Sequence, residues 1–171
     1  MSAPTVGFCS ACGARAGVAL PFTCPACGTT HYLNPRPTSC ALVMHAGRLL
    51  LIKRGRDPWG GCWDIPGGFC DGAEHPIGAA RREVREEAGV DCEIGDYLGS
   101  WLDVYADGLP TLNAYYHATA ATDAVGTPDG DEVTEIGWFH PDELPEPIAF
   151  PDSQRPVLQA WRAALPDRLG A

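Results

Sequence analysis

The chain has 171 residues, a formal net charge of -10 and 45% hydrophobic residues. This length and composition suit one catalytic domain with a packed core and a small appendage. The acidic balance argues against a broad electrostatic footprint on nucleic acid and against binding to an anionic membrane surface. The sequence has no apolar run of about 18 residues, and its first residues lack a basic region followed by an apolar one. We therefore expect a soluble, cytoplasmic protein.

Four cysteines near the start have the spacing of a zinc ribbon. They form two Cys-x2-Cys pairs, each followed by a glycine, namely Cys9 and Cys12, then Cys24 and Cys27. Four thiolates close the coordination sphere of Zn²⁺, so the predicted zinc is structural and not catalytic. Only Arg15 is basic between residues 9 and 28. A structural role or homodimer formation is therefore favoured over nucleic-acid binding for this segment.

The next part of the chain predicts a hairpin and a short strand. A connector interrupted by Pro35 and Pro37 leads to strands at residues 39–44 and 48–53, joined by a turn at 45–47. A loop at 57–61 precedes a short strand at 63–65. We expect the ribbon and connector to occupy residues 1–34 and the main domain residues 35–171.

The following segment predicts an amphipathic helix between Pro76 and Gly89, since proline suits a first helical turn and glycine a left-handed C-terminal residue. Its apolar stripe consists of Ile77, Ala80, Val84 and Ala88. Strands are expected at 93–103, 111–119 and 135–139, with a turn at 106–108, a helical turn at 141–144 and a last helix at 153–165. This mixed order predicts an α/β fold in which helices sandwich a sheet.

Three glutamates on the predicted helix point to a metal. Glu83, Glu86 and Glu87 stand at positions i, i+3 and i+4, so their carboxylates project from one helical face. Like charges so close together repel, and a hard cation such as Mg²⁺ or Mn²⁺ would neutralise them. The alternative is a solvated acidic face without a ligand.

The wider pattern decides between these two interpretations. The sequence has Gly68, Glu74, Arg82, Glu83, Val84, Glu86, Glu87, Gly89 and Val90 at the spacing of the Nudix signature. The chain therefore resembles the Nudix hydrolases. The resemblance implies an α/β/α sandwich with a mixed sheet. It also implies metal-dependent cleavage of a nucleoside diphosphate linked to another moiety.

The resemblance also implies roles for individual residues. Glu83, Glu86 and Glu87 correspond to the Mg²⁺ or Mn²⁺ ligands, and the carbonyl of Gly67 is a further candidate ligand. Arg82 and Glu74 correspond to residues that hold the loop and the helix in register.

A zinc ribbon before this signature resembles the branch that contains the NADH pyrophosphatases. There, Glu132 would be a fourth carboxylate ligand and Phe69 would stack on the nucleobase. Their alternatives are a solvated loop acid and a core aromatic. Residues 99–105 lack the Ser-Gln-Pro-Trp-Pro-Phe-Pro segment of that branch, so a resemblance to ADP-ribose or FAD pyrophosphatases is favoured.

Basic and aromatic residues supply further candidates for substrate contacts. Arg54 is the first candidate for gripping the pyrophosphate, with Lys53 beside it, because guanidinium groups bind phosphate in a bidentate manner. The alternative for both is a solvated strand end. Four aromatics are candidates for a base-binding wall or for the core, namely Trp101, Tyr105, Tyr115 and Tyr116.

Two functions from different classes remain. The first is a pyrophosphohydrolase acting on a small nucleotide such as ADP-ribose, NADH or FAD. The second is a Nudix-fold sensor that binds such a nucleotide without cleaving it. The three intact glutamates favour catalysis. Removal of NAD caps from RNA is a third possibility, which the low basicity disfavours.

Overall fold

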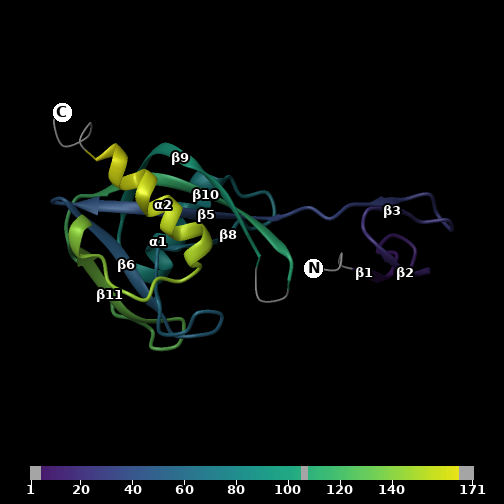
Figure 1. Ribbon diagram of the computed structural model, residues 1–171, viewed down its shortest axis with the longest axis horizontal. Helices are drawn as coiled ribbons and strands as arrows, with labels where there is room; N and C mark the ends of the chain where they lie inside the picture. Colours follow the sequence, from purple (N-terminus) through teal and green to yellow (C-terminus); the bar gives the residue numbers. More distant parts are fainter. Residues whose placement is uncertain (1–4, 105–107, 166–171) are drawn as a thin grey trace.

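The computed structural model describes residues 5–104 and 108–165. Two short hairpins begin the chain. Strand β1 (Thr5–Phe8) pairs with β2 (Arg15–Ala19), and β3 (Phe22–Thr23) pairs with β4 (Thr30–His31). In Figure 1 these hairpins stand away from the main body, at the end where the chain enters the next strand.

The main body is built on one seven-stranded mixed sheet. Its main path runs in the order β11-β6-β5-β10-β9, with β7 beside β6 and β8 beside β5. The pair β5–β10 is parallel, and the other pairs are antiparallel. The strands are β5 (Arg36–His45), β6 (Arg48–Arg54), β7 (Trp63–Asp64), β8 (Gly67–Phe69), β9 (Cys92–Val104), β10 (Pro110–Ala120) and β11 (Val133–Phe139). The strands predicted from residue 39 onward are all present, whereas β8 was not predicted.

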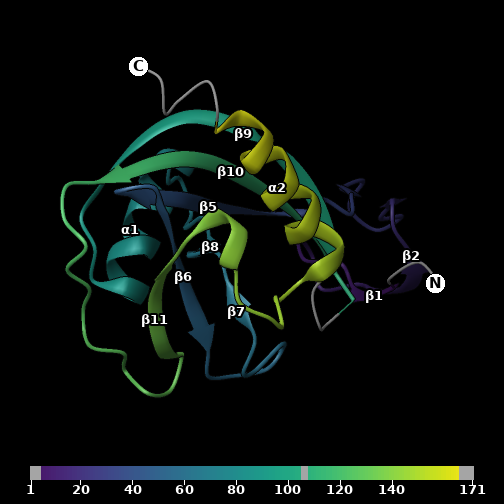
Figure 2. The same cartoon turned by 60° about the vertical axis from the view of Figure 1, so that its left-hand side comes forward.

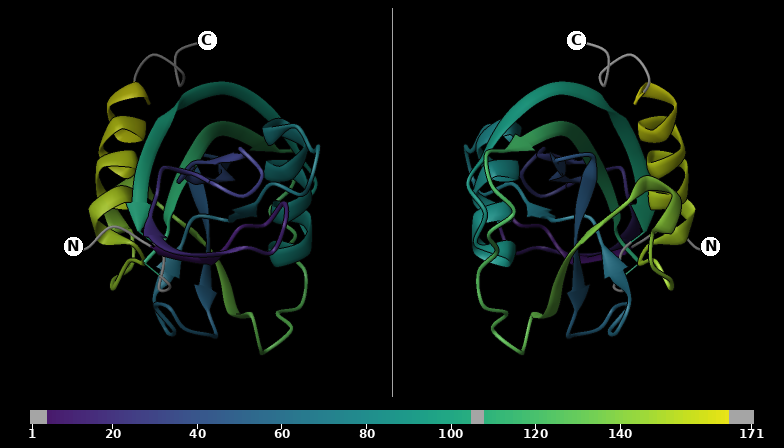
Figure 3. Two further views of the ribbon diagram at one scale, coloured as in Figure 1. Left: turned by 90° about the vertical axis from the view of Figure 1, so that its right-hand side faces the viewer. Right: turned by 90° about the vertical axis from the view of Figure 1, so that its left-hand side faces the viewer.

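Side chains along the central strands point alternately to the two faces of the sheet, so the hydrophobic core has a part on each face. On β6, Leu49 and Leu51 belong to one buried cluster, while Leu50 and Ile52 belong to the other. Helix α2 (Pro151–Ala164) packs on the first cluster, and helix α1 (Pro76–Ala88) packs on the second. Figures 2 and 3 show the two helices on opposite sides of the sheet. The predicted α/β/α sandwich is confirmed.

Helix α1 begins and ends where the sequence predicted. The side chain of His75 accepts a hydrogen bond from the Ile77 amide, and Gly89 ends the helix with a left-handed φ of 65°. A Cβ at Gly89 would lie 2.6 Å from the Cα of Gly126, so glycine is required there for space as well. The predicted apolar stripe is wrong at Ile77, which is 36% exposed. The other three residues of the stripe, Ala80, Val84 and Ala88, are buried against the sheet.

Strands β7 and β8 take over the pairing of β6 and β5 beyond the turn between those two strands. Strands β5 and β6 pair only next to their turn, at Met44 with Leu49 and at His45 with Arg48. Beyond that point β5 pairs with β8 and β6 pairs with β7. Two acids of α1, Glu83 and Glu87, lie against β8 there.

The last elements follow the prediction with small shifts. A 3-10 turn at Pro141–Glu143 precedes α2, which starts two residues before the predicted position. The predicted turn at 106–108 falls mostly on residues outside the described ranges. No helix among the described residues is long and apolar enough to cross a membrane.

Candidate functional site

Glu87 is the most enclosed of the three helical acids. Its Oε2 accepts a hydrogen bond of 2.9 Å from the Gly67 amide at the start of β8. Burial, and then the negative charge of Asp64, raises the pKa of Glu87 well above its ordinary value. A carboxylate in this position gains strongly from a nearby cation.

Glu83 lies against the same strand, and Glu86 faces solvent. The side chain of Glu83 is 14% exposed and that of Glu86 is 59% exposed. A Cβ at Gly68 would come within 2.4 Å of Oε1 of Glu83, so a larger residue there would displace the Glu83 carboxylate. Burial raises the pKa of Glu83 although the charge of Arg82 acts in the opposite direction.

Arg82 connects the helix to the loop before it. Its Nε and Nη2 donate to the two carboxylate oxygens of Glu74 at 3.1 and 2.9 Å. Its Nη1 donates to Glu83 and Glu86 at 2.8 and 2.9 Å, and its Nη2 also donates to the carbonyl of Phe69 at 3.0 Å. The guanidinium therefore holds the loop and two of the three helical acids in one geometry.

A cavity of about 260 Å³ lies beside these acids. The acids Glu83, Glu87 and Glu132 line it together with the buried carboxylate of Asp64. Glu132 comes from the loop before β11, and its carboxylate lies 3.5 Å from the guanidinium of Arg56. Carboxylates from three separate segments thus converge on one hollow.

The spread of these acids bears on the predicted metal site. In the part of the chain that the structure describes, only the four N-terminal cysteines form a group of three or more His, Cys, Asp or Glu donors close enough to hold one metal ion, with ligand atoms all within 4.8 Å of one another. The helical acids are less tightly grouped than the sequence indicated, because Arg82 lies between Glu83 and Glu86. The hard oxygen donors and the raised pKa values of Glu83 and Glu87 still fit a divalent cation.

The two basic candidates point in different directions. Arg54 lines the cavity, where its Nη1 donates to Asp64 at 2.7 Å and its Nε to the Pro58 carbonyl at 2.8 Å. Lys53 instead donates to Glu135 at 2.7 Å and is not among the described residues that line the cavity. The prediction that Lys53 contacts the pyrophosphate is therefore not supported, because neighbouring side chains on a strand point to opposite faces.

The aromatic candidates divide in the same way. Phe69 lines the cavity at 36% exposure, with the guanidinium of Arg36 5.0 Å from its ring centre. Tyr115 is buried at the cavity wall, and Trp101 packs edge-on against it at 5.6 Å. Tyr116 instead packs against the cluster on the other face of the sheet, beside Tyr97, in agreement with the core alternative for this residue. Tyr105 lies outside the described residues.

Asp64 and Gln154 were not predicted as site residues. Both are buried at the cavity, and the Gln154 amide donates to the Asp64 carboxylate. Burial raises the pKa of Asp64, and the Arg54 charge acts in the opposite direction. The available signal was an acid in the otherwise apolar strand 63–65. Gln154 carries no such signal, since it reaches the site only through the placement of α2.

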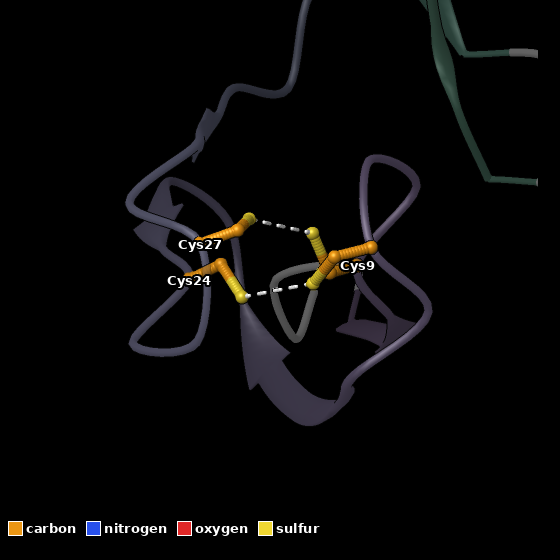
Figure 4. A group of neighbouring side chains, drawn as sticks. Cys9, Cys24 and Cys27 are labelled. Carbon is orange, nitrogen blue, oxygen red and sulfur yellow. Dashed lines mark hydrogen bonds between the residues drawn. The ribbon is translucent and has the colours of Figure 1, made fainter.

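The four N-terminal cysteines form a second, separate site, shown in Figure 4. The Sγ atoms of Cys9 and Cys27 lie 3.7 Å apart, and those of Cys12 and Cys24 lie 3.8 Å apart. These separations are too long for disulfides, whose S–S length is about 2.05 Å. They match the edge of a tetrahedron with Zn–S bonds of about 2.3 Å, which is about 3.8 Å. The thiol set fits Zn²⁺.

The backbone around the cysteines supports the same interpretation. The amides of Gly13 and Gly28 donate to the carbonyls of Cys9 and Cys24, each at 2.8 Å. The two glycines have φ values of 74° and 75°, as a tight turn with a left-handed residue requires. The two Cys-x2-Cys turns are thus closely similar, as the sequence predicted.

Comparison with known proteins places the fold and the acidic signature in one family. The NUDIX domain family matches residues 34–161, which is well over half of the chain. This chain belongs to the NUDIX family. Its signature residues are those of helix α1 and the preceding loop, so the cavity beside them is the candidate active site of a NUDIX domain.

Two relatives illustrate the range of the family. The "NAD-capped RNA hydrolase NudC" of Stutzerimonas stutzeri is 34% identical over 170 residues, covering 95% of this chain but 57% of that protein. This chain therefore spans little more than half the length of that relative. The "ADP-ribose pyrophosphatase" of Methanocaldococcus jannaschii is 31% identical over 124 residues, covering 70% of this chain and 69% of that protein.

Solved structures give the same result. A NUDIX hydrolase from Nitrosomonas europaea superimposes with a TM-score of 0.76 at 26% identity, covering 97% of this chain and 94% of that one. A MutT NUDIX hydrolase from Burkholderia pseudomallei has a TM-score of 0.67 at 34% identity, with 74% and 98% covered.

Proposed function

We propose that this NUDIX chain is a metal-dependent pyrophosphohydrolase that cleaves the diphosphate of a nucleoside diphosphate linked to another moiety. The observation that carries the proposal is the convergence of Glu83, Glu87 and Glu132 on one cavity. Burial has raised the pKa values of the first two, so the wall of the cavity favours bound cations. A diphosphate bridged by divalent metal provides those cations and fills the hollow.

Within this proposal, the ligands of Mg²⁺ or Mn²⁺ are Glu83, Glu86, Glu87, Glu132 and the carbonyl of Gly67. Metal held there would neutralise phosphate oxygens and lower the pKa of an attacking water. Arg82 keeps Glu83 and Glu86 in position through its hydrogen bonds. Arg54, fixed by Asp64, presents its guanidinium to the cavity as a phosphate contact.

We propose ADP-ribose or a dinucleotide such as NADH or FAD as the substrate class. Phe69 at the cavity entrance is available to stack on a base or a nicotinamide ring. The relative named as an ADP-ribose pyrophosphatase supports the first choice. The relatives named as NAD-capped RNA hydrolases favour a second candidate, an RNA that begins with NAD. They count against the expectation, drawn from charge, that disfavours nucleic acid as a partner.

Zn²⁺ bound by Cys9, Cys12, Cys24 and Cys27 is the proposed structural metal. We propose residues 1–34 as ribbon and connector and residues 35–171 as the catalytic domain, which agrees with the start of β5 at Arg36. The intact acids favour catalysis over a non-catalytic nucleotide sensor. A cytoplasmic location and a homodimer stay predictions of the sequence.

The test is hydrolysis in water enriched in heavy oxygen, with Mg²⁺ or Mn²⁺ and a panel of ADP-ribose, NADH, FAD, a diadenosine polyphosphate and NAD-capped RNA. Attack at phosphorus should give AMP and ribose 5-phosphate from ADP-ribose, with the label on a phosphate. Release of free nicotinamide, or label only on a ribose oxygen, would show glycosidic cleavage instead. Binding of a nucleotide without any cleavage would support the sensor.

A further inference from the structure

The loop before β11 is ordered by a single carboxylate. Oδ1 of Asp129 accepts hydrogen bonds from three successive backbone amides, those of Asp131 at 2.9 Å, Glu132 at 2.9 Å and Val133 at 3.0 Å. The Gly130 amide donates to the carbonyl of Val133 at 2.9 Å and closes the turn. These bonds lower the pKa of Asp129, so the acceptor is an ionised carboxylate at neutral pH.

A second contact fixes the same loop from the opposite side. The Gly55 amide, just after β6, donates to the carbonyl of Glu132 at 2.8 Å. A Cβ at Gly55 would lie 2.0 Å from the carbonyl oxygen of Asp131, so a larger residue would push the loop away. The amide of Glu132 is therefore held by Asp129 and its carbonyl by Gly55.

These contacts fix the backbone from which the side chain of Glu132 extends. Glu132 lines the cavity together with Glu83 and Glu87, and its carboxylate, in a side chain that is 62% exposed, lies 3.5 Å from the guanidinium of Arg56. The charge of Glu132 contributes to the raised pKa values of both acids, which agrees with this proximity. Asp129 itself is not among the described residues that line the cavity.

We propose that Asp129 is a positioning residue, which places the Glu132 carboxylate at the metal-binding wall by holding the backbone amides of its loop. The inference rests on the proposed function, since it assigns Glu132 a part in that reaction. A carboxylate that is already oriented avoids the entropy cost of ordering its loop when metal and substrate bind. A misplacement of about 1 Å can cost about a hundredfold in rate.

The competing explanation is that Asp129 only stabilises the fold by anchoring the start of β11. The two explanations differ in their dependence on Glu132. A positioning residue loses its effect when Glu132 can no longer act, whereas a purely structural residue keeps its effect in every background.

The experiment compares Asp129→Ala, Asp129→Asn and a matched control, Asp131→Ala, in wild-type and Glu132→Gln backgrounds. Asp131 is an acid in the same loop. Its side chain is 75% exposed, and its carboxylate lies 3.5 Å from the guanidinium of Arg56. Turnover of the substrate identified above and the affinity for Mn²⁺, followed by electron paramagnetic resonance, are measured for each protein. Thermal unfolding is measured in parallel.

We expect Asp129→Ala to lower turnover and Mn²⁺ affinity by about tenfold or more. Asp129→Asn should recover most of this loss, because its amide oxygen can still accept the three N–H bonds. In the Glu132→Gln background Asp129→Ala should change either quantity by less than about twofold. Asp131→Ala should resemble wild type in both.

Equal losses from Asp129→Ala in both backgrounds would overturn the proposal in favour of a structural role. Wild-type turnover and Mn²⁺ affinity in Glu132→Gln would also overturn it, while leaving the proposed function intact. Failure of the proposed function is recognised separately, by a wild-type protein that binds but does not hydrolyse any diphosphate in the panel.

Discussion

Replacing Glu87 by glutamine should change stability and activity in opposite directions. Glu87 is mostly buried near Asp64, and the amide of Gly67 donates to it. Glutamine keeps the shape of the side chain and an oxygen for the Gly67 amide, but it removes the charge. Without metal, the negative charge of the buried carboxylate opposes folding. With metal, the same carboxylate is a proposed ligand.

The size of the stability effect follows from the raised pKa of Glu87. A pKa that differs by one between the folded and unfolded states corresponds to about 1.4 kcal/mol, and the pKa of Glu87 lies well above the ordinary 4.5. Because the folded-state pKa is raised, the favourable contribution of the protonated acid is fully present below pH 4.5 and is lost as the pH rises through the folded-state value. In chelator at pH 8, Glu87→Gln should therefore be more stable than wild type by at least about 1 kcal/mol, or about 3 °C in Tm.

The assay is thermal unfolding in chelator across pH 4 to 9, repeated with saturating Mn²⁺, together with turnover. The Glu87→Gln variant should lose at least about a hundredfold in turnover, which is about 2.7 kcal/mol, and most of its stabilisation by Mn²⁺. Glu86→Gln is the matched control, because its side chain is 59% exposed and its neutralisation should leave the metal-free Tm almost unchanged. A Glu87→Gln variant that is less stable than wild type in chelator, or that retains near-normal turnover, would refute the reasoning.

Cys24→Ser should release the ribbon zinc and make the N-terminal segment sensitive to protease; metal analysis that finds no zinc in the wild-type protein would contradict this expectation. Gly89→Ala should lower the free energy of unfolding by about 1–3 kcal/mol, because φ is 65° and the new Cβ would meet Gly126; urea denaturation with an unchanged midpoint would disprove it. Lys53→Ala should keep kcat/KM within about twofold of wild type, because Lys53 pairs with Glu135. Arg54→Ala should lower kcat/KM about tenfold or more, because this substitution removes a cation from the cavity and leaves the buried Asp64 without its charge partner. Equal kinetic effects of the two substitutions would contradict the assignment of their side chains.

Local sequence signals predicted the elements and the acidic signature because each is encoded by residues that lie near one another along the chain. Pro76 and Gly89 mark the ends of α1, and the spacing of Glu83, Glu86 and Glu87 places them on that helix. The two Cys-x2-Cys turns are equally local, since Gly13 and Gly28 supply the left-handed residues. Ile77 is the exception, because helical periodicity alone cannot tell which residues of an apolar stripe the sheet covers.

The sequence by itself thus determined the order of elements, the family signature and the chemical type of the two candidate metal sites, since these depend on residue type and short-range spacing. Only the tertiary structure decided which side chains share the cavity. Lys53 and Arg54 are neighbours in sequence, yet one pairs with Glu135 and the other with Asp64. Asp64 meets Gln154 across a long separation in sequence, and Glu132, from a loop whose backbone is bonded to Asp129 and Gly55, lines the same cavity as Glu83 and Glu87. The physical reason is that strand pairing and helix docking fix the face on which each side chain lies, and those contacts join residues that the sequence keeps far apart.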